Sequence, residues 1–372
     1  MRLITLFAAC ILGPPASAQW TVQATGTKAR LRGLCVVGDR IAWACGTGGA
    51  LLRTTDGGRM WEAETVSGAD SLDFRDVQAF NDKTAYLLSI GAGEQSRIYK
   101  TTDGGASWAR SYVNQDPKGF FDALAFWDAG HGLVLGDPVN GRFAILTTDD
   151  GGATWNSIPP TGMPPAPAGE GAFAASGTCL TVQGDESAWF ATGGVKVARV
   201  FRSTNRGRSW TAHETPVMAG TPSSGVFALA FRDAEHGIAV GGDFKEPQRA
   251  GDVVAITDDG GRTWRLPRGR RPGGYRSAVA YVPGTRGPTL VAVGPTGADV
   301  SEDGGENWRP SGTMGFHAVG FAGPTAGWAV GDDGLVVRFR GTGIEPGGRG
   351  AARPRALRTS RSRRPARPRG CS

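Results

Sequence analysis

The sequence is poor in the residues that most often carry metal-dependent or nucleophilic catalysis. It has four histidines and five cysteines in 372 residues, and none of them has the spacing of a zinc site. It lacks the G-x-S-x-G elbow of serine hydrolases. Patterns of the form G-x-G-x-x-G are expected by chance in a chain with 59 glycines, and no strand–helix unit surrounds one here. We therefore expect no metal site and no cofactor.

Long apolar runs are absent beyond the N-terminus. The run from Leu3 to Leu12 follows Arg2 and is too short to cross a bilayer. It leads into the small-residue motif Ala16-Ser17-Ala18, after which a signal peptidase would cleave before Gln19. We predict a signal peptide over residues 1–18, export to the periplasm or the cell exterior, and no membrane span in the mature chain.

The formal net charge of +7 belongs to the C-terminal tail and not to the rest of the chain. Residues 341–372 contain nine arginines and a single acid, Glu345. With that tail and Arg2 set aside, residues 19–340 carry a net charge of −2. A nearly neutral body is not expected to bind nucleic acid. The Arg-rich segment 342–372 is expected to be a solvated, disordered extension, with contact to an acidic lipid, polysaccharide or nucleic acid as the alternative.

Glycine and tryptophan are the residues in excess. The 59 glycines make up about twice the usual share, and there are 11 tryptophans but only five tyrosines. Because no G-X-Y register exists, the glycines are assigned to turns. Many turns together with many large anchoring side chains indicate short strands rather than long helices.

A repeat dominates the sequence. Six segments follow the pattern S/T-x-D-x-G-x-x-W, and we call this pattern the Asp-box. Its central positions are Asp56, Asp103, Asp150, Asn205, Asp259 and Asp303, and its tryptophans are Trp61, Trp108, Trp155, Trp210, Trp264 and Trp308. Three short apolar runs precede each box and a fourth follows it, which is the period of a four-stranded propeller blade.

The ends of the repeat predict how the ring closes. Trp20 opens the mature chain with a strand that follows no box, and residues 316–339 supply three strands without a fourth. If the N-terminal strand completes that last blade, no sheet edge is left open. We predict an all-β fold, a seven-bladed β-propeller of four-stranded blades over residues 19–341, and we expect a monomer.

The Asp-box has a mechanical explanation. The central Asp can accept hydrogen bonds from the backbone N–H groups of its own turn, and the next glycine supplies the positive φ that a tight hairpin requires. The Ser or Thr hydroxyl can brace the same turn, while the Trp packs on the blade. We interpret the boxes as structural and expect no catalytic residue among them.

The candidate binding residues lie on the opposite face from the boxes. Alignment of the blades places five side chains at the start of the first strand, around the mouth of the central channel: Arg32, Arg75, Asp122, Arg276 and His317. Loops of the same face add Asp137, Arg142, Glu170, Lys196, Asp243, Lys245 and Arg249, together with long insertions over residues 159–171, 214–225, 241–251 and 265–274. Several arginines at one mouth can clamp a carboxylate or phosphate. The alternative is that these charges pair with one another.

The boxes resemble the Asp-boxes, or BNR repeats, of sialidases and of other glycoside hydrolases. The whole body resembles the photosystem II stability/assembly factor-like propellers most closely, in their non-photosynthetic bacterial form. Runs such as GDPVNGRFAILTTDDGGATW and LAFRDAEHGIAVGGD carry that resemblance. It implies an exported, non-catalytic scaffold that binds a protein or peptide partner, with Arg32, Arg75 and Arg276 as the matching contact residues. An anionic glycan is the other ligand to consider.

A sialidase-like glycoside hydrolase is the rival reading. Such enzymes hold the substrate carboxylate with three arginines and use a Tyr nucleophile with an Asp acid. Arg32, Arg75 and Arg276 with Tyr275 and Asp122 sketch that set, but the Arg-Ile-Pro run near the sialidase N-terminus is missing.

Cysteine usage leaves one pairing open. Cys35 and Cys45 flank a turn, so they could lie on neighbouring strands and form a disulfide in an exported protein. We favour two small buried thiols, because the geometry between neighbouring strands often does not suit the bond.

Overall fold

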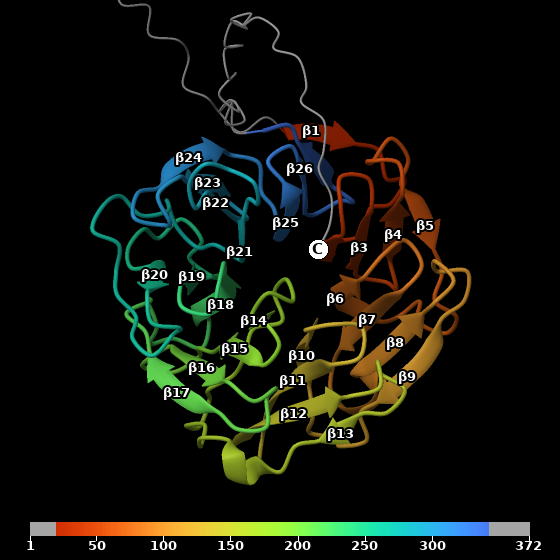
Figure 1. Cartoon of the computed structure of the whole chain (residues 1–372), viewed down its shortest axis with the longest axis horizontal. Helices are drawn as coiled ribbons and strands as arrows, with labels where there is room; N and C mark the ends of the chain where they lie inside the picture. The colour runs from red at the N-terminus through yellow and green to blue at the C-terminus, as the bar shows by residue number, and fades with distance from the viewer. Residues whose placement is uncertain (1–19, 342–372) are drawn as a thin grey trace, which may run out of the picture.

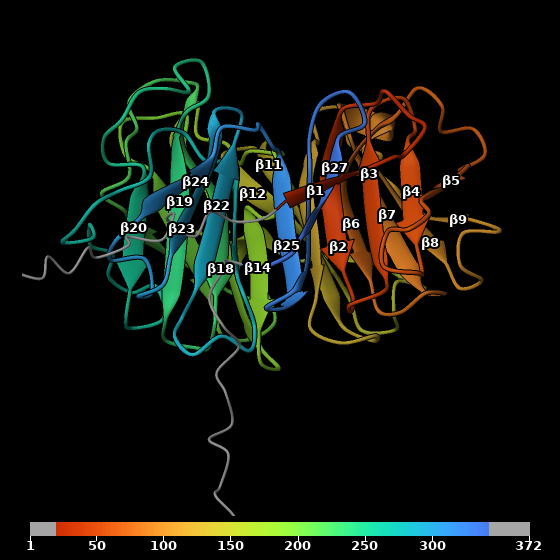
Figure 2. The ribbon, with the colours of Figure 1, turned by 90° about the horizontal axis from the view of Figure 1, so that it is seen from above.

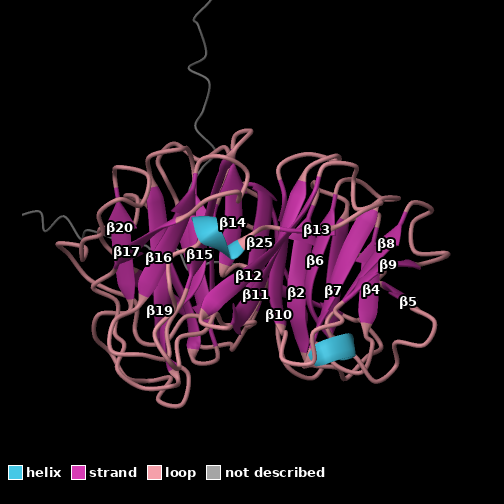
Figure 3. Cartoon of the chain, turned by 90° about the horizontal axis from the view of Figure 1, so that it is seen from below, coloured by secondary structure: helices cyan, strands magenta, loops and turns pink. Residues whose placement is uncertain are grey.

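The computed structural model describes residues 20–341, and these form a ring of seven β-sheets around a central axis (Figure 1). The expected signal peptide over 1–18 and the Arg-rich tail over 342–372 lie outside the described residues. Two 3-10 turns, η1 (Gly93–Gln95) and η2 (Pro160–Gly162), are the helical segments of the described chain (Figure 3). No helix among residues 20–341 has the length and apolar character needed to cross a membrane.

The first three blades follow one another along the chain. Within each blade the strands are given in order from the ring axis outward. Blade 1 holds β2 (Leu31–Val36), β3 (Ala42–Gly46), β4 (Leu51–Thr54) and β5 (Glu62–Glu64). Blade 2 holds β6 (Asp73–Ala79), β7 (Ala85–Ile90), β8 (Arg97–Thr101) and β9 (Ala109–Val113). Blade 3 holds β10 (Phe121–Phe126), β11 (Gly132–Val139), β12 (Arg142–Thr148) and β13 (Asn156–Ser157).

The other four blades complete the ring. Blade 4 holds β14 (Leu180–Gln183), β15 (Ser187–Ala191), β16 (Arg199–Ser203) and β17 (Thr211–Glu214). Blade 5 holds β18 (Ser224–Phe231), β19 (Gly237–Asp243) and β20 (Val254–Thr257). Blade 6 holds β21 (Ala278–Tyr281), β22 (Leu290–Gly294), β23 (Gly297–Ser301) and β24 (Arg309–Gly312). Blade 7 holds β25 (Ala318–Gly323), β26 (Ala326–Val330), β27 (Val336–Phe339) and β1 (Trp20–Gln23).

Every strand pairs antiparallel with its neighbour, and the strands stand roughly along the ring axis when the molecule is seen from the side (Figure 2). Inner strands are buried on both faces, as in β10 and β3, because each blade lies between two others. Outer strands such as β5 and β13 are largely exposed. The burial gradient matches the sequence, in which apolar runs precede each box and polar residues follow it.

The ring closes through the N-terminal strand, as the sequence predicts. β1 pairs antiparallel with β27 over four residues, from Trp20 opposite Phe339 to Gln23 opposite Val336. The Trp20 ring packs on Phe316, Phe321 and Phe339, with ring centroids 5.0–6.5 Å away. Blade 7 is therefore built from both ends of the folded chain.

Blade 5 departs from the prediction of four strands in every blade. After its box, the chain makes one bridge, in which Ile256 and Arg265 exchange both backbone hydrogen bonds at 2.8 and 3.0 Å. The next hydrogen-bonded position along this pairing falls on Pro267, opposite Val254. Since proline has no N–H to donate, the outer strand ends after a single pair.

The six Asp-boxes share one hydrogen-bond pattern, seen for example at Thr148 and Asp150. The Thr148 hydroxyl donates to Asp150 at 2.8 Å and accepts from the Gly152 N–H at 2.7 Å. Asp150 in turn accepts from the Thr154 N–H at 2.8 Å. The glycines take positive φ, +67° at Gly151 and +72° at Gly152, which a side chain would disfavour.

The fourth box shows that the pattern does not depend on a charge. Asn205 accepts the Ser203 hydroxyl at 2.9 Å and the Ser209 N–H at 2.9 Å, as the aspartates of the other boxes do. A neutral amide thus fulfils the role of the carboxylate. The boxes act as turn braces through hydrogen-bond geometry.

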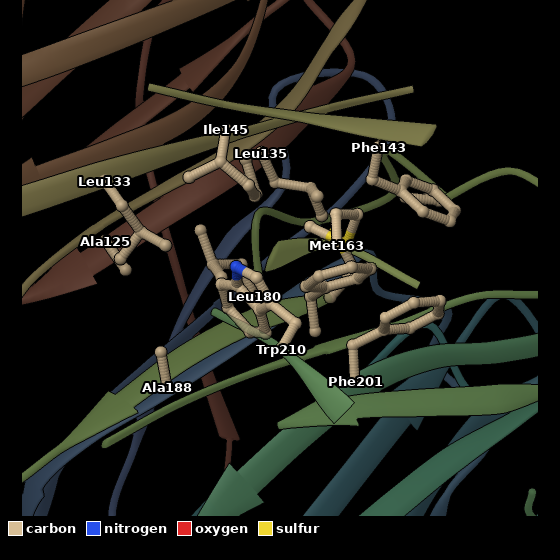
Figure 4. Packing of buried hydrophobic residues seen from close by; sticks show 14 residues of the cluster. Ala125, Leu133, Leu135, Phe143, Ile145, Met163, Leu180, Ala188, Phe201 and Trp210 are labelled. Atoms are coloured by element: carbon tan, nitrogen blue, oxygen red, sulfur yellow. The ribbon is translucent and has the colours of Figure 1, made fainter. Parts of the chain in front are cut away.

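Each box tryptophan packs against the preceding blade. Trp210 of blade 4 lies among residues of blade 3, including Leu133 and Ile145 (Figure 4). Trp108 meets Trp43 of blade 1 edge-on at 6.2 Å, and Trp264 packs in the cluster around Trp189 of blade 4. Seven apolar clusters of this kind fill the seven blade interfaces. Blade 7 has no box, and Trp20 occupies the corresponding cluster between blades 6 and 7.

We expect Thr148→Val to lower the free energy of unfolding by about 1–3 kcal/mol, because the buried Gly152 N–H would lose its acceptor. Thr154→Val is the matched control in the same turn, since its exposed hydroxyl makes one bond, to Asp150. Its cost should be about 0.5 kcal/mol or less. Denaturant unfolding of both variants measures this, and equal losses would contradict the bracing role of the buried hydroxyl.

We expect Trp20→Ala to lower the free energy of unfolding by about 2–4 kcal/mol, because it removes the ring that fills the last blade interface. Val22, on the same strand, is 60% exposed. Val22→Ala should therefore change stability by no more than about 0.5 kcal/mol. Thermal and denaturant melts of the two variants test the closure, and a Trp20→Ala protein as stable as the wild type would refute it.

Candidate functional site

A pocket of about 520 Å³ opens at the ring axis on the face where the first strands begin. This size lies within the range of small-ligand sites. We call it the axial pocket. It is lined by Arg30, Arg32, Arg75, Ile90, Phe120, Asp122, Asp137, Ala172, Phe173, Ala174, Ala175, Phe227, Phe244, Tyr275, Pro295, His317 and Asp332.

The chain before β14 reaches into the central channel (Figure 1), and its residues 172–175 line the axial pocket. The Ala174 carbonyl accepts from Arg75 of blade 2 at 2.7 Å, and the Ser176 hydroxyl donates to the Ser277 carbonyl beside blade 6 at 2.9 Å. This crossing segment, residues 172–178, ties opposite sides of the ring together. The segment therefore narrows the channel beneath the mouth of the pocket.

Glycines let the crossing segment approach the inner strands. Gly193 bridges both Gly171 and Gly225, and a Cβ at Gly193 would lie 2.6 Å from the Phe173 ring. Such a contact is too short for any side chain. The small residues therefore make room for Phe173, which stacks on Phe227 with ring centroids 3.9 Å apart.

Arg32 is the unpaired cation of the axial pocket. Its side chain makes no hydrogen bond or ion pair with any residue between 20 and 341, and its Nε is buried. Burial, and secondly the nearby charge of Arg75, lowers the pKa of Arg32 to about 10. Burying a guanidinium without a partner is costly. An anionic ligand would relieve that cost, so Arg32 is the strongest anion-binding group of the site.

The other arginines of the pocket already have partners. Arg75 donates to both carboxylate oxygens of Asp73, at 2.9 and 2.7 Å, and to Ala174. Arg30 donates to Asp332 at 2.7 Å, and His317 Nε2 lies 3.0 Å from the same carboxylate oxygen. Burial lowers the pKa of His317, so that it is mostly neutral near pH 7.

Arg276 does not line the axial pocket, although the sequence alignment groups it with Arg32 and Arg75. Its side chain is buried and pairs with Asp299, to which its Nε donates at 2.8 Å. It also donates to the Tyr275 carbonyl at 2.8 Å and to Thr296 at 3.1 Å. The structure therefore brings together Arg32, Arg75, Asp122 and His317, and turns Arg276 into the blade.

Two carboxyl groups of blade 3, those of Asp122 and Asp137, line the pocket. Asp122 is buried, one of its oxygens has no hydrogen-bond partner among the described residues, and burial raises its pKa well above the usual range. Burial also raises the pKa of Asp137 to about 6, while Asp137 accepts the Ala172 N–H at 3.0 Å. Neither forms an ion pair with Arg32, so the channel charges do not simply neutralise one another.

Aromatic side chains form the side of the pocket that faces Arg32. Phe173, Phe227, Phe244 and Tyr275 come from blades 4 to 6, across the ring from Arg30, Arg32 and Arg75 of blades 1 and 2. Tyr275 meets Phe227 edge-on at 4.7 Å, and Phe244 is 45% exposed at the mouth. The pocket thus has one cationic side and one apolar side.

Most of the loop residues predicted to join the site lie elsewhere. Of that group, Asp137 lines the pocket. Glu170 is buried in an ion pair with Arg199, Arg249 pairs with Glu246, and Asp243 accepts from Thr221 at 3.0 Å. Arg142 donates to the Met163 carbonyl, while Lys196 and Lys245 point to solvent.

The residues that the sequence analysis missed are Arg30, Asp332 and the three phenylalanines of the aromatic side. Arg30 precedes Arg32 by two positions, so both lie on the same side of the chain as it enters β2. Phe173 and Phe244 lie just after or inside the insertions noted above. Those insertions were the available signal, but their crossing of the channel depends on contacts between distant blades.

The set of groups required by a sialidase-like reaction is incomplete. Tyr275, Arg32, Arg75 and Asp122 do share the pocket. Arg276 is turned away, and no carboxylate among the described residues hydrogen-bonds Tyr275. Burial raises the pKa of Tyr275 above its usual value, which opposes formation of a phenolate nucleophile.

The thiols and acids do not form a metal site within the described chain. No cluster of three or more His, Cys, Asp or Glu between residues 20 and 341 is placed to hold a metal ion. Cys35, Cys45 and Cys179 are free in the structure, and burial raises the pKa of each. Cys35 lies opposite Trp43, and Cys45 lies opposite Gly33.

Comparisons with known proteins support the fold and its repeat. Residues 14–120 match the family model described as photosynthesis system II assembly factor YCF48, which is less than a third of the chain. The chain therefore shares the repeat sequence of that family in its first blades. No curated protein matches the chain at a significant level.

Solved structures of similar fold include both binding proteins and enzymes. YCF48 bound to a D1 peptide is 17% identical with a TM-score of 0.59, over 88% of this chain and 99% of that one. YCF48 from Cyanidioschyzon merolae is 18% identical with a TM-score of 0.62, over 87% and 99%. A GH74 xyloglucanase from Xanthomonas campestris is 18% identical with a TM-score of 0.60, over 88% of this chain but 55% of the enzyme. At such identities these likenesses show the fold.

A third carboxyl, Asp76, lies against Gly177 of the crossing segment and provides a test of burial. It is buried, accepts the Leu124 N–H at 2.9 Å, and burial raises its pKa from 3.8 to about 7. The folded protein therefore holds this proton more tightly than the unfolded chain does. Its contribution to stability is complete below about pH 4 and falls as pH rises to about 7.

We expect Asp76→Asn to match the wild type near pH 4 and to exceed it by roughly 2–4 kcal/mol near pH 8, because the amide needs no desolvation of a charge. Asp70→Asn, an exposed change in the connection that leads into β6, should show no such trend. Unfolding free energies across this pH range measure the difference. A stability difference for Asp76→Asn that does not change with pH would contradict the raised pKa.

Proposed function

We propose that the chain is an exported, non-catalytic propeller scaffold that binds a protein or peptide partner at the axial pocket, as an assembly or stability factor of a non-photosynthetic bacterial type. The observation that carries this proposal is the unpaired Arg32 guanidinium in a pocket whose other side is aromatic. A guanidinium takes a carboxylate in a forked geometry, and the partner's anionic group would supply the missing acceptor.

Export enters the proposal from the sequence, through the expected signal peptide over residues 1–18. A peptide ligand is favoured because YCF48, which has the same fold, is described as bound to a D1 peptide. The near-neutral charge of residues 19–340 also suits a protein ligand better than a nucleic acid.

A carboxylate-bearing glycan is the second candidate ligand, because Tyr275, Arg32 and Asp122 share the pocket and could surround a sugar acid. The buried Arg276 and the absence of a carboxylate partner for Tyr275 within residues 20–341 make turnover of such a glycan the weaker reading. A fluorogenic sialic-acid substrate tests it on the same preparation.

We expect Arg32→Gln to weaken partner capture at least about tenfold, because one charge-assisted contact is lost from a partly buried site. Arg286→Gln is the matched control: Arg286 is exposed, has no ion pair within the described chain, and lies in the β21–β22 loop on the opposite face. Arg276 is left unchanged because its ion pair with Asp299 is buried in the blade.

The measurement is affinity capture from periplasmic and membrane extracts with the wild type and both variants, read by quantitative mass spectrometry. A partner that is lost with Arg32→Gln and kept with Arg286→Gln supports the scaffold. Equal capture by all three proteins would refute the role of the axial pocket. Turnover of the sialic-acid substrate that disappears with Tyr275→Phe would replace the scaffold with an enzyme.

A further inference from the structure

We infer that the axial pocket recognises one carboxylate together with one adjacent apolar side chain, so that its ligand is a peptide segment with a single negative charge and not a polyacidic one. This rests on the proposed function and specifies its ligand. Two features support it. On one side of the pocket every arginine except Arg32 is already paired with an acid, and the other side is aromatic.

The charges of the pocket leave room for one anionic group. Arg75 is committed to Asp73 and Ala174, and Arg30 is committed to Asp332. Among the charged side chains between residues 20 and 341 that line the pocket, Arg32 alone is a cation without an acid partner. A second or third anionic group of the ligand would be repelled by Asp332 or Asp137, which line the same pocket.

The side opposite Arg32 is aromatic, and the Tyr275 hydroxyl is its one polar side-chain group among the described residues. Phe173 and Phe227 are stacked face to face, and the Tyr275 ring meets Phe227 edge-on. Phe244 stands 45% exposed beside them, with its ring 6.1 Å from that of Phe227. Covering an exposed aromatic ring with another apolar group is favourable, because it removes apolar surface from water. A carboxylate held by Arg32 would place its neighbouring side chain on this cluster.

The size of the pocket agrees with a short segment. About 520 Å³ holds one or two side chains with their backbone, and residues 172–175 line this space. The crossing segment narrows the way through the ring, so we expect the ligand to enter from the mouth of the pocket.

Two sources present this chemistry: the free carboxyl end of a chain with an apolar last residue, and an Asp or Glu side chain beside an apolar residue. Labelled synthetic peptides distinguish them. The probes are Gly-Gly-Ala-Phe with a free carboxyl end, the same peptide ending in Ala, the same peptide as its amide, and the amide of Gly-Asp-Phe-Gly. A fifth probe, Asp-Asp-Asp-Phe with a free end, tests the effect of added charge.

The affinity of each labelled peptide for the full chain is measured by fluorescence anisotropy at about 0.15 M salt. We expect the Phe-ending acid to bind at least about fivefold tighter than the Ala-ending acid, from the apolar surface that it buries. The Asp-rich peptide should bind no tighter than the singly charged one. Binding of the amidated Gly-Asp-Phe-Gly in place of the free-ended peptide would assign the carboxylate to a side chain.

Two variants separate this inference from the proposed function. Phe244→Ala should abolish the preference for the Phe-ending over the Ala-ending acid, because it removes the exposed ring that the ligand's apolar side chain would cover, and an exposed ring can be removed with the core intact. Arg32→Gln should weaken binding of every acid. If Arg32→Gln weakens binding but Phe and Ala ends bind equally, the proposed function stands and this inference fails.

Other results would also overturn the inference. Tighter binding of the Asp-rich peptide would show that the pocket accepts several charges. The same Phe preference in wild type and Phe244→Ala would place the apolar contact elsewhere. No binding of any acid below about 1 mM, or binding unaffected by Arg32→Gln, would remove both the inference and the axial pocket as the site.

Discussion

Packing between adjacent blades is the interaction on which this protein depends. A single four-stranded sheet has two apolar faces and cannot bury either alone, so each blade is stable only between two others. The box tryptophans act in this contact, since Trp108, Trp210 and Trp264 all reach into the blade before their own. The hydrogen-bonded turn that carries each Trp sets its position, which explains why box and tryptophan occur together.

Closure follows from the same constraint. A ring of seven blades has seven interfaces, and six of them contain a box tryptophan. The interface between blades 6 and 7 contains none. Trp20 fills it from the opposite end of the chain, while β1 supplies the missing strand to β27. The two ends of the ring are thereby locked in one sheet, and the outer strand of blade 5 can be reduced to one bridge without opening the ring.

The rigid ring positions the axial pocket and also sets its charge. Side chains at the starts of the seven first strands converge at one mouth. The loop between β26 and β27 adds Asp332, which pairs there with Arg30, 302 residues away in the chain. Most of the resulting charges find partners, and the crossing segment takes part of the donor capacity of Arg75. What remains is a site with one free guanidinium facing an aromatic cluster, a combination suited to holding a small amphipathic group.

The sequence by itself determined the fold and the closure of the ring. The Asp-box period counts the blades, and the unmatched Trp20 strand pairs with the unmatched last three, because local turn chemistry and strand alternation are written in neighbouring residues. Position on a first strand was also readable, and so Arg32, Arg75, Asp122 and His317 were placed at the mouth.

Only the tertiary structure decided which of those side chains are available. Arg276 occupies an equivalent sequence position yet turns to Asp299, 23 residues away, and Arg75 is held by Asp73 and Ala174. Ion-pair choice and the path of residues 172–178 across the channel depend on contacts between residues distant in sequence. A repeat pattern does not encode such contacts, because it records what the blades share, and the pocket is made from what differs between them.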